Sequence, residues 1–464
     1  MLKIILLIIF LVFANINIFA NEKLYDIKDF VISEMKESEK LWDLNAKQAS
    51  VLKNENILVK NFYLILYKGG TKSATITGLN GTIFKNKNIE IRNNVNVKNV
   101  NGVIINTEYL FWDNSDLSLS NDTYVTVIKE NNELFCKGIK YFDNKEYIKF
   151  LNEFQLKNRT YKNQYVKSNR AEYYVNKGYI KLTGDVSFIY NDYTLQNDFS
   201  EIFIDEKNNF KSFSGFGKNK LLYYQNKILS DTLFINFIMQ NKINSLNFIQ
   251  NVRFNYDIYN GQTNDMLIKL NEDQTINEII FKDKFLINND TIIINGRKSN
   301  FNFVQNKIKN IVANTFYIDY KTDNEIIHFV NILNEIKIKC EWLNDLISKI
   351  FILDRSKIFI NEKNEIIADN FEINFDKQKK VNQIIIKKNI IAQKDDYKFF
   401  GDLLIGDLDT ISIYNNLKMV NIVNNDEMNS EKCKVYYNQN KKIDKMVFLN
   451  LNNSMLNIEN IKNE

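Results

Sequence analysis

The stretch that decides the fold is "SNRAEYYVNKGYIKLTGDVSFIYNDYTLQNDFSEIFIDEKNN", residues 168–209. It contains one phrase twice: a small or polar residue, a short alternating run, an Asp or Asn turn, and a second alternating run. The second copy repeats the offsets of the first, in the pairs Ser168 and Asn197, Ala171 and Ser200, and Asn176 and Asp205. A phrase that recurs at fixed offsets predicts a repeat architecture.

The phrase can be followed along the chain by its first residue, which we call the anchor. Neighbouring anchors are spaced by roughly 30 residues, a period typical of repeat proteins. One interval, from Lys298 to Ala368, is about twice as wide, and we expect that one copy has drifted there, around residues 320–350. The anchors are Ala46, Gly78, Thr107, Lys137, Ser168, Asn197, Ser230, Thr263, Lys298, Ala368, Gly401 and Ser430.

Two further positions accompany the anchor in most copies. The third residue after it is small or apolar, as in Ala49, Gly81, Leu110, Ala171, Ser200, Leu233, Met266, Phe301, Phe371, Leu404 and Cys433. The eighth is Asp or Asn, as in Asn54, Asn86, Asn176, Asp205, Asn271, Asn306, Asp376, Asp409 and Asn438.

The residues between these positions alternate with a period of two, which is typical of β-strands. In "YIKLTGDVSFIY", residues 179–190, the apolar residues share one parity and are therefore expected on one face: Ile180, Leu182, Val186, Phe188 and Tyr190. A repeat of about 30 residues that holds two alternating strands and two turns excludes helical repeats. It predicts an all-β, continuous antiparallel array in which stacked neighbours supply the core.

Composition narrows the function classes. The 464 residues carry 61 basic and 56 acidic side chains mixed along the chain, with a net charge of +5, so a nucleic-acid partner is not expected. Cys136, Cys340 and Cys433 lie too far apart for a disulfide framework or a metal site, and the single His328 lies in an apolar run. We therefore expect no enzyme activity, no metal and no cofactor.

The N-terminus reads "MLKIILLIIFLVFANINIFANEK", residues 1–23. One Lys, an apolar run and a small residue at Ala20 are the layout of a secretory signal cleaved after Ala20. An uncleaved membrane anchor is the alternative. In either case the body of the protein is expected to be exported, with a periplasmic location.

Six phrases follow one another between residue 27 and about residue 155: "IKDFVIS" (27–33), "LWDLNAKQA" (41–49), "ATITGLNGTIF" (74–84), "NNVNV" (93–97), "NGVIINTEYLFWD" (101–113) and "YVTVIKENNELFCKGIKYFDN" (124–144). In this order they resemble LptC, a periplasmic component of the lipopolysaccharide-transport (Lpt) system. From residue 166, "VKSNRAEYYVNKGYIKLTGDVSFIYNDYTLQND" resembles LptA and the OstA-like domain of LptD. Beyond about residue 300 only the period continues.

The resemblance implies an elongated OstA-like β-jelly-roll ribbon, V-shaped in section, whose apolar interior carries the acyl chains of lipopolysaccharide or a related glycolipid from the inner to the outer membrane. It implies as partners an inner-membrane Lpt ABC transporter, an outer-membrane LptD-like translocon and end-to-end self-association. The expected division is a signal or anchor at 1–20, an LptC-like module at 21–155, an LptA/OstA-like module at 156–300 and further repeats at 301–464.

Apolar residues of one parity are candidates for the lining of a lipid groove: Ile89, Ile91, Val95, Val97, Ile104, Leu110, Trp112, Ile180, Leu182, Val186, Phe188, Ile202 and Ile204. They would line either an open trough or an ordinary closed core, and a structural or adhesive β-solenoid without ligand is the alternative function. The first strand is the candidate docking edge for the transporter, through Ile27, Phe30, Val31 and Ile32. The sequence does not identify the lipid.

Overall fold

The structure is a computed structural model. It describes residues 23–451 with the exception of 37–38, 117, 143–146, 160–163, 206–209, 239–241, 257, 291, 322–325, 333–334, 344–345, 361–363, 377–380, 395, 407–409 and 438–442. The predicted signal segment, residues 1–20, lies outside the described residues. The described chain is almost entirely β-strand, and it divides into two compact units, Met1–Tyr224 and Gln225–Glu464.

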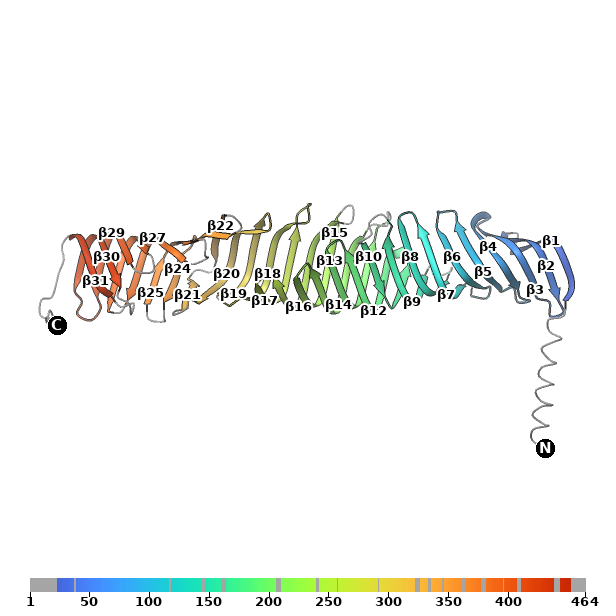
Figure 1. Cartoon of the computed structure of the whole chain (residues 1–464), viewed down its shortest axis with the longest axis horizontal. Coiled ribbons are helices and arrows are strands. Elements are labelled where there is room, and N and C mark those ends of the chain that lie inside the picture. The colour runs from blue at the N-terminus through green and yellow to red at the C-terminus, as the bar shows by residue number, and fades with distance from the viewer. Residues whose placement is uncertain are drawn as a thin grey trace, which may run out of the picture. The chain divides into compact units, whose positions relative to one another are not determined.

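The strands of the first unit follow one another in chain order (Figure 1). They are β1 Lys23–Lys36, β2 Glu39–Leu52, β3 Ile57–Lys68, β4 Thr71–Ile83, β5 Ile89–Asn99, β6 Ile104–Asp113, β7 Ser118–Lys129, β8 Asn132–Phe142, β9 Tyr147–Asn158, β10 Gln164–Ser168, β11 Arg170–Tyr174, β12 Tyr179–Tyr190, β13 Tyr193–Ile204 and β14 Phe210–Tyr223, with a 3-10 turn at Val175–Lys177. Each long strand pairs antiparallel with its neighbours in the chain, so the unit is one continuous meander. Strands β10 and β11 together fill one place between β9 and β12.

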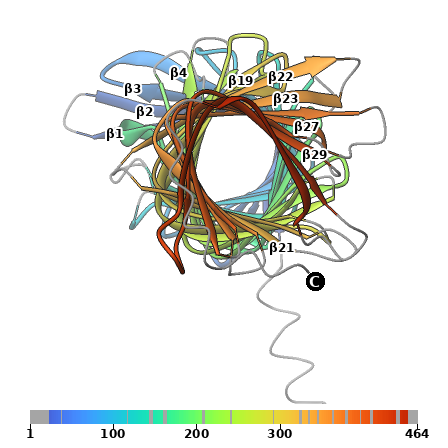
Figure 2. The same cartoon turned by 90° about the vertical axis from the view of Figure 1, so that its left-hand side faces the viewer.

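The second unit continues the same pattern. Its strands are β15 Asn226–Ile238, β16 Lys242–Tyr256, β17 Tyr259–Leu270, β18 Ile276–Asn288, β19 Ile292–Val304, β20 Lys307–Lys321, β21 Ile326–Asn331, β22 Ile336–Leu343, β23 Leu346–Ile352, β24 Ser356–Ile360, β25 Asn364–Ala368, β26 Asn370–Phe375, β27 Val381–Lys394, β28 Tyr397–Gly406, β29 Thr410–Asn421, β30 Glu427–Tyr437 and β31 Ile443–Leu451. Figure 2 shows that strands of this unit nearest the viewer curve over instead of lying flat.

The gap in the anchor series corresponds to strands that are split in two. Strand β20 pairs with β22 through Asn310–Ala313 and with β21 through Tyr317–Lys321. Strands β21 and β22 therefore occupy the place of one bent strand, and the drifted copy predicted there is present. The pairs β23 with β24 and β25 with β26 are arranged in the same way between β20 and β27.

Most long strands bend near the middle, and the anchor phrase encodes this bend. The register shifts there, for example between Thr183 and Val186 in the pairing of β12 with β13. In one type of strand, inward side chains on either side of the bend are four residues apart, and Gly184 and Asp185 between them have positive φ angles. In other strands they are three residues apart, as in Asn197 and Ser200, which are both buried.

The anchor and the third residue after it are therefore the two inward positions of a three-residue bend. Both positions are buried in the pairs Ala46 and Ala49, Thr107 and Leu110, Ser168 and Ala171, Ser230 and Leu233, Thr263 and Met266, Ala368 and Phe371, and Ser430 and Cys433. Two anchors depart from this rule: Lys137 and Lys298 are exposed, and Cys136 and Ser299 beside them are buried instead.

At three bends, which interrupt the ladder of backbone hydrogen bonds, a small polar side chain bonds a backbone carbonyl, whereas Ser230 Oγ has no partner among the described residues. Buried carbonyl groups freed there need a donor. Thr107 Oγ1 donates to the carbonyl oxygen of Tyr124 at 2.9 Å, and Thr263 Oγ1 donates to that of Lys284 at 2.9 Å. Ser168 Oγ donates to the carbonyl oxygen of Arg170 at 2.8 Å.

The predicted all-β, antiparallel, jelly-roll-like fold with a repeat of two strands is confirmed. The sequence boundaries predicted at residues 155/156 and 300/301 fall inside β9 and β19, so strand pairing runs through both of them. The three predicted modules stay a prediction about sequence relationships.

Candidate apolar groove

Two rows of inward side chains form facing walls in the first unit. The first wall lies on one side of the bends and is built by cross-strand neighbours on β2, β3 and β4: Trp42 with Leu66, Leu44 with Leu64, and Leu64 with Ile76. The second wall lies on the other side of the bends, on β5, β6 and β7: Ile91 with Leu110, Ile89 with Trp112, and Trp112 with Leu119. Alternation places these apolar side chains on one face of each strand.

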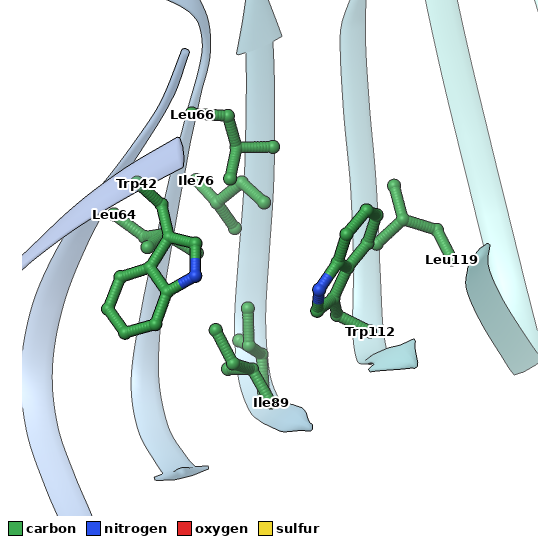
Figure 3. Close-up of a pocket in the computed structure, with 8 residues that line it drawn as sticks. Trp42, Leu64, Leu66, Ile76, Ile89, Trp112 and Leu119 are labelled. Atoms are coloured by element: carbon green, nitrogen blue, oxygen red, sulfur yellow. The ribbon is translucent and has the colours of Figure 1, made fainter. Parts of the chain in front are cut away.

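A small cavity lies between the two walls. Four of its lining residues come from the first wall and four from the second: Trp42, Leu64, Leu66 and Ile76, and Ile89, Ile91, Trp112 and Leu119. Figure 3 shows the two indole rings on opposite sides of this space, with Ile89 between them. The cavity volume is about 10 Å³, room for about one water molecule. The walls pack against each other here, so an acyl chain must displace side chains to enter.

The structure places most of the predicted lining residues on the inner face. Ile89, Ile91, Val95, Val97 and Leu110 belong to one buried cluster, and Trp112 packs against it. Farther along the unit, Ile180, Leu182, Val186, Phe188 and Ile202 are buried and Ile204 is half-buried. Contact of these residues with a lipid stays a prediction.

Ile104 is the exception and is corrected here. Its cross-strand partner is Lys98, whereas the partner of its neighbour Ile105 is the buried Val97. Ile105, which packs against the buried cluster, is therefore the inward residue. The bend from Thr107 to Leu110 takes three residues, so counting by twos backward from Leu110 reaches the wrong face.

The interior near Phe188 is filled by aromatic rings. The Phe188 ring lies 6.2 Å from that of Tyr190, 5.8 Å from that of Phe210 and 5.3 Å from that of Phe213, measured between centroids. This part of the inner face is a packed aromatic core. It brings Phe188 together with the rings of Phe210 and Phe213, which the sequence analysis did not select.

Five residues that line the cavity were missed by the sequence analysis: Trp42, Leu64, Leu66, Ile76 and Leu119. Each lies in a strand in which the alternation of apolar and polar residues shows which side chains face inward. Their meeting across the cavity depends on which wall faces which, and no local pattern contains that information.

One ion pair joins the two walls beside Trp42. Glu34, the cross-strand partner of Trp42 on β1, accepts a hydrogen bond from Lys87, which lies in the turn between β4 and β5. The Lys87 Nζ to Glu34 Oε1 distance is 2.5 Å, and the Glu34 side chain is only 19% exposed. This contact ties the first strand to a turn of the second wall, so it opposes separation of the walls.

The carboxylate of Asp43, on the opposite face from Trp42, is held by three donors. Ser33 Oγ donates to it at 2.5 Å, Tyr67 OH at 2.9 Å and Lys40 Nζ at 3.0 Å. The Ser33 hydrogen bond is the largest cause that lowers the pKa of Asp43, with Lys40 and Tyr67 adding to it. The first wall is thus fixed on its outer face by charge-assisted hydrogen bonds.

The predicted docking edge is strand β1. Among the described residues β1 pairs with β2 alone, which leaves its other edge unpaired. Phe30 and Ile32 pack against the buried cluster, whereas Ile27 is 37% and Val31 64% exposed. Leu24, Tyr25 and Met35 are exposed on the same strand.

The next feature is the placement of metal-ligating side chains in the part of the chain that the structure describes. No cluster of three or more His, Cys, Asp or Glu side chains that suits a metal ion lies in that part of the chain. His328 Nδ1 is 2.8 Å from Asp319 Oδ1 on the neighbouring strand. Nor do the described ranges contain a helix of the length and apolarity that a membrane crossing requires.

Comparison with known proteins bears on the part of the chain that contains the cavity. Residues 4–156 match the family model described as lipopolysaccharide-assembly, LptC-related. This LptC-related segment covers about a third of the chain and includes all of the residues that line the cavity. It confirms the LptC resemblance of the N-terminal part, whereas the LptA resemblance of the following repeats stays a prediction. No curated protein matches the chain.

Proposed function

We propose that the chain is a periplasmic bridge that carries the acyl chains of lipopolysaccharide or a related glycolipid from the inner to the outer membrane. The observation that supports it most is that two apolar walls face each other within the LptC-related segment. Removing apolar surface from water contributes about 25 cal/mol per Å². A lipid tail therefore needs an apolar lining along its route, and in this proposal the largely apolar inner face of each unit is that lining.

Transport by this route requires no chemical step. When the lipid chain enters, contacts between apolar side chains of the two walls are replaced by contacts with the lipid. The apolar area that is buried therefore changes little. Net movement needs a source of energy outside the chain, which in this proposal is an ATP-driven Lpt transporter at the inner membrane. An LptD-like translocon receives the lipid at the outer membrane.

The free edge of β1 is the proposed docking site for the transporter. An unpaired strand edge presents backbone donors and acceptors that template another strand. The exposed apolar side chains of Leu24, Val31 and Met35 add area for such a contact. The same kind of edge would allow end-to-end association between copies of the chain.

A structural or adhesive role with a closed core is the second candidate. It is favoured by one observation, the packing of the walls around a cavity of only about 10 Å³. In that case the apolar interior stabilises the array and binds nothing.

The experiment that separates the two functions is mass spectrometry of lipids that co-purify with the full chain from its native envelope. Leu119 is half-buried and lines the cavity, so Leu119→Glu places a charge in the groove; Tyr124→Glu, on the exposed side of the same strand, is the matched control. The transport function predicts a bound glycolipid that Leu119→Glu loses and Tyr124→Glu keeps, with both variants folded by circular dichroism. Absence of lipid from the folded wild-type chain would favour the closed core.

Phe188 is unsuited to this test because its ring packs against three others.

A further inference from the structure

The indole nitrogen of Trp42 is buried and lacks a hydrogen-bond acceptor among the described residues. The side chain as a whole is 5% exposed. An indole N–H is a donor only, and a buried donor without an acceptor is unfavourable, so native proteins rarely leave one unpaired.

Trp342 shows how the same chain satisfies an indole elsewhere. Its Nε1 donates to the carbonyl oxygen of Ile308 at 2.7 Å. The unpaired nitrogen of Trp42 is therefore a property of its position between the walls and not of tryptophan in this fold.

The Trp42 nitrogen is turned toward the cavity. Figure 3 shows the nitrogen on the side of the ring that faces the space between the walls, and Trp112 turns its own nitrogen toward the same space. All of the other lining side chains are aliphatic. A water molecule placed there would find few of the two to four polar partners that hold buried waters in proteins.

We propose that Trp42 Nε1 is the hydrogen-bond donor for a carbonyl oxygen at the acyl linkage of the lipid cargo. This inference rests on the proposed lipid-carrying function and adds a polar contact to it. An ester or amide carbonyl is an uncharged acceptor attached directly to an apolar chain, which matches one donor in an otherwise apolar lining. A phosphate does not match, because an anion between these walls would be desolvated, and the nearby Lys40 and Lys87 are paired with Asp43 and Glu34.

The test compares an ester with its ether. The full chain labelled with ¹⁵N-tryptophan gives three indole signals, from Trp42, Trp112 and Trp342, which single Trp→Phe variants assign. It is titrated with 1-decanoylglycerol and with 1-O-decylglycerol, which share the chain and the glycerol but differ in the carbonyl. We expect the ester to bind about five- to tenfold more tightly, as one hydrogen bond to a buried donor implies. We also expect the ester to move the Trp42 indole proton downfield and the ether to leave it near its apo position.

Two variants show which tryptophan makes the hydrogen bond to the ester carbonyl. Trp42→Phe keeps most of the apolar volume and removes the N–H, so it should bind ester and ether equally; Trp112→Phe should keep the preference for the ester. Equal binding of both lipids by the wild-type chain, or an ester preference that survives in Trp42→Phe, would overturn this inference and leave the lipid-carrying function standing. Failure of both lipids to bind the folded chain would contradict the proposed function itself.

Discussion

At the scale of single residues, the Thr107 hydroxyl is the clearest case of a side chain that stabilises its bend. Thr107 Oγ1 donates to the carbonyl oxygen of Tyr124 and accepts from Asn121 Nδ2 at 2.6 Å. Thr107→Val keeps the shape, takes this donor from the buried carbonyl oxygen of Tyr124, and removes one acceptor from Asn121, whose Nδ2 also donates to Tyr109 and Thr123. We expect it to lower the free energy of unfolding by about 1–3 kcal/mol. Thr126→Val, at a half-buried position on the neighbouring strand, is the control and should change it by less than about 0.5 kcal/mol in denaturant melts.

The cysteines are a second residue-scale case. Burial raises the pKa of Cys136, Cys340 and Cys433 to about 12 each. Thiolate is the reactive form, and at pH 8 a thiol of this pKa is ionised to about one part in ten thousand. We expect iodoacetamide to leave all three unmodified in the folded chain and to alkylate all three in guanidinium, as read by intact-mass spectrometry. Rapid modification of the native protein would show that these residues are not buried as described.

The bends also determine which inward positions could be predicted from the sequence. The inward positions of β5 and β12 were predictable because a four-residue bend preserves parity, as Ile91 with Val95 and Leu182 with Val186 show. A three-residue bend reverses parity, which is why Ile104 was assigned to the wrong face while Leu110 was not. The anchor phrase was visible in the sequence, but its meaning as a bend required the strand register.

At the scale of elements, β1 tests the docking proposal. Val31→Pro removes one backbone N–H from β1 and restricts the conformation of the strand, whereas Val31→Ala removes only an exposed side chain. If a partner strand pairs with this edge, Val31→Pro should abolish co-purification with the inner-membrane transporter and Val31→Ala should retain it. Retention of the transporter by a folded Val31→Pro chain would exclude β1 as the docking edge.

The ion pair between Lys87 and Glu34 tests the separation of the walls. Lys87→Met removes the contact that ties β1 to a turn of the second wall, so we expect lipid uptake about two- to fivefold faster, in keeping with ~0.5–1 kcal/mol for an ion pair near the surface. Lys85→Met is the matched control, since Lys85 pairs with Glu55 in the neighbouring turns at 3.0 Å. Stopped-flow fluorescence with a labelled lipid measures both variants. Equal rates in Lys87→Met and wild type would show that this pair does not limit opening.

At the scale of the whole chain, the fold was more predictable than the site. Alternation along each strand and the regular spacing of the anchors sufficed for an antiparallel array of two-strand repeats, because both signals are readable from the sequence alone. The cavity between Trp42 and Trp112 was not predictable, because it depends on two walls that come from different strands meeting across the interior. The strands split at their bends between β20 and β27 were predictable only as a gap in the anchor series.

Because the interior is packed, lipid transport requires the two walls to move apart and admit a lipid chain. The most direct measurement places a photo-crosslinking amino acid at Leu119, inside the cavity, and at Tyr124, on the exposed side of the same strand, in the chain expressed in its native envelope. After irradiation, mass spectrometry should find a glycolipid adduct at position 119 and none at position 124. An unmodified chain at position 119, from folded protein whose crosslinker is shown to be photoactive, would contradict the account.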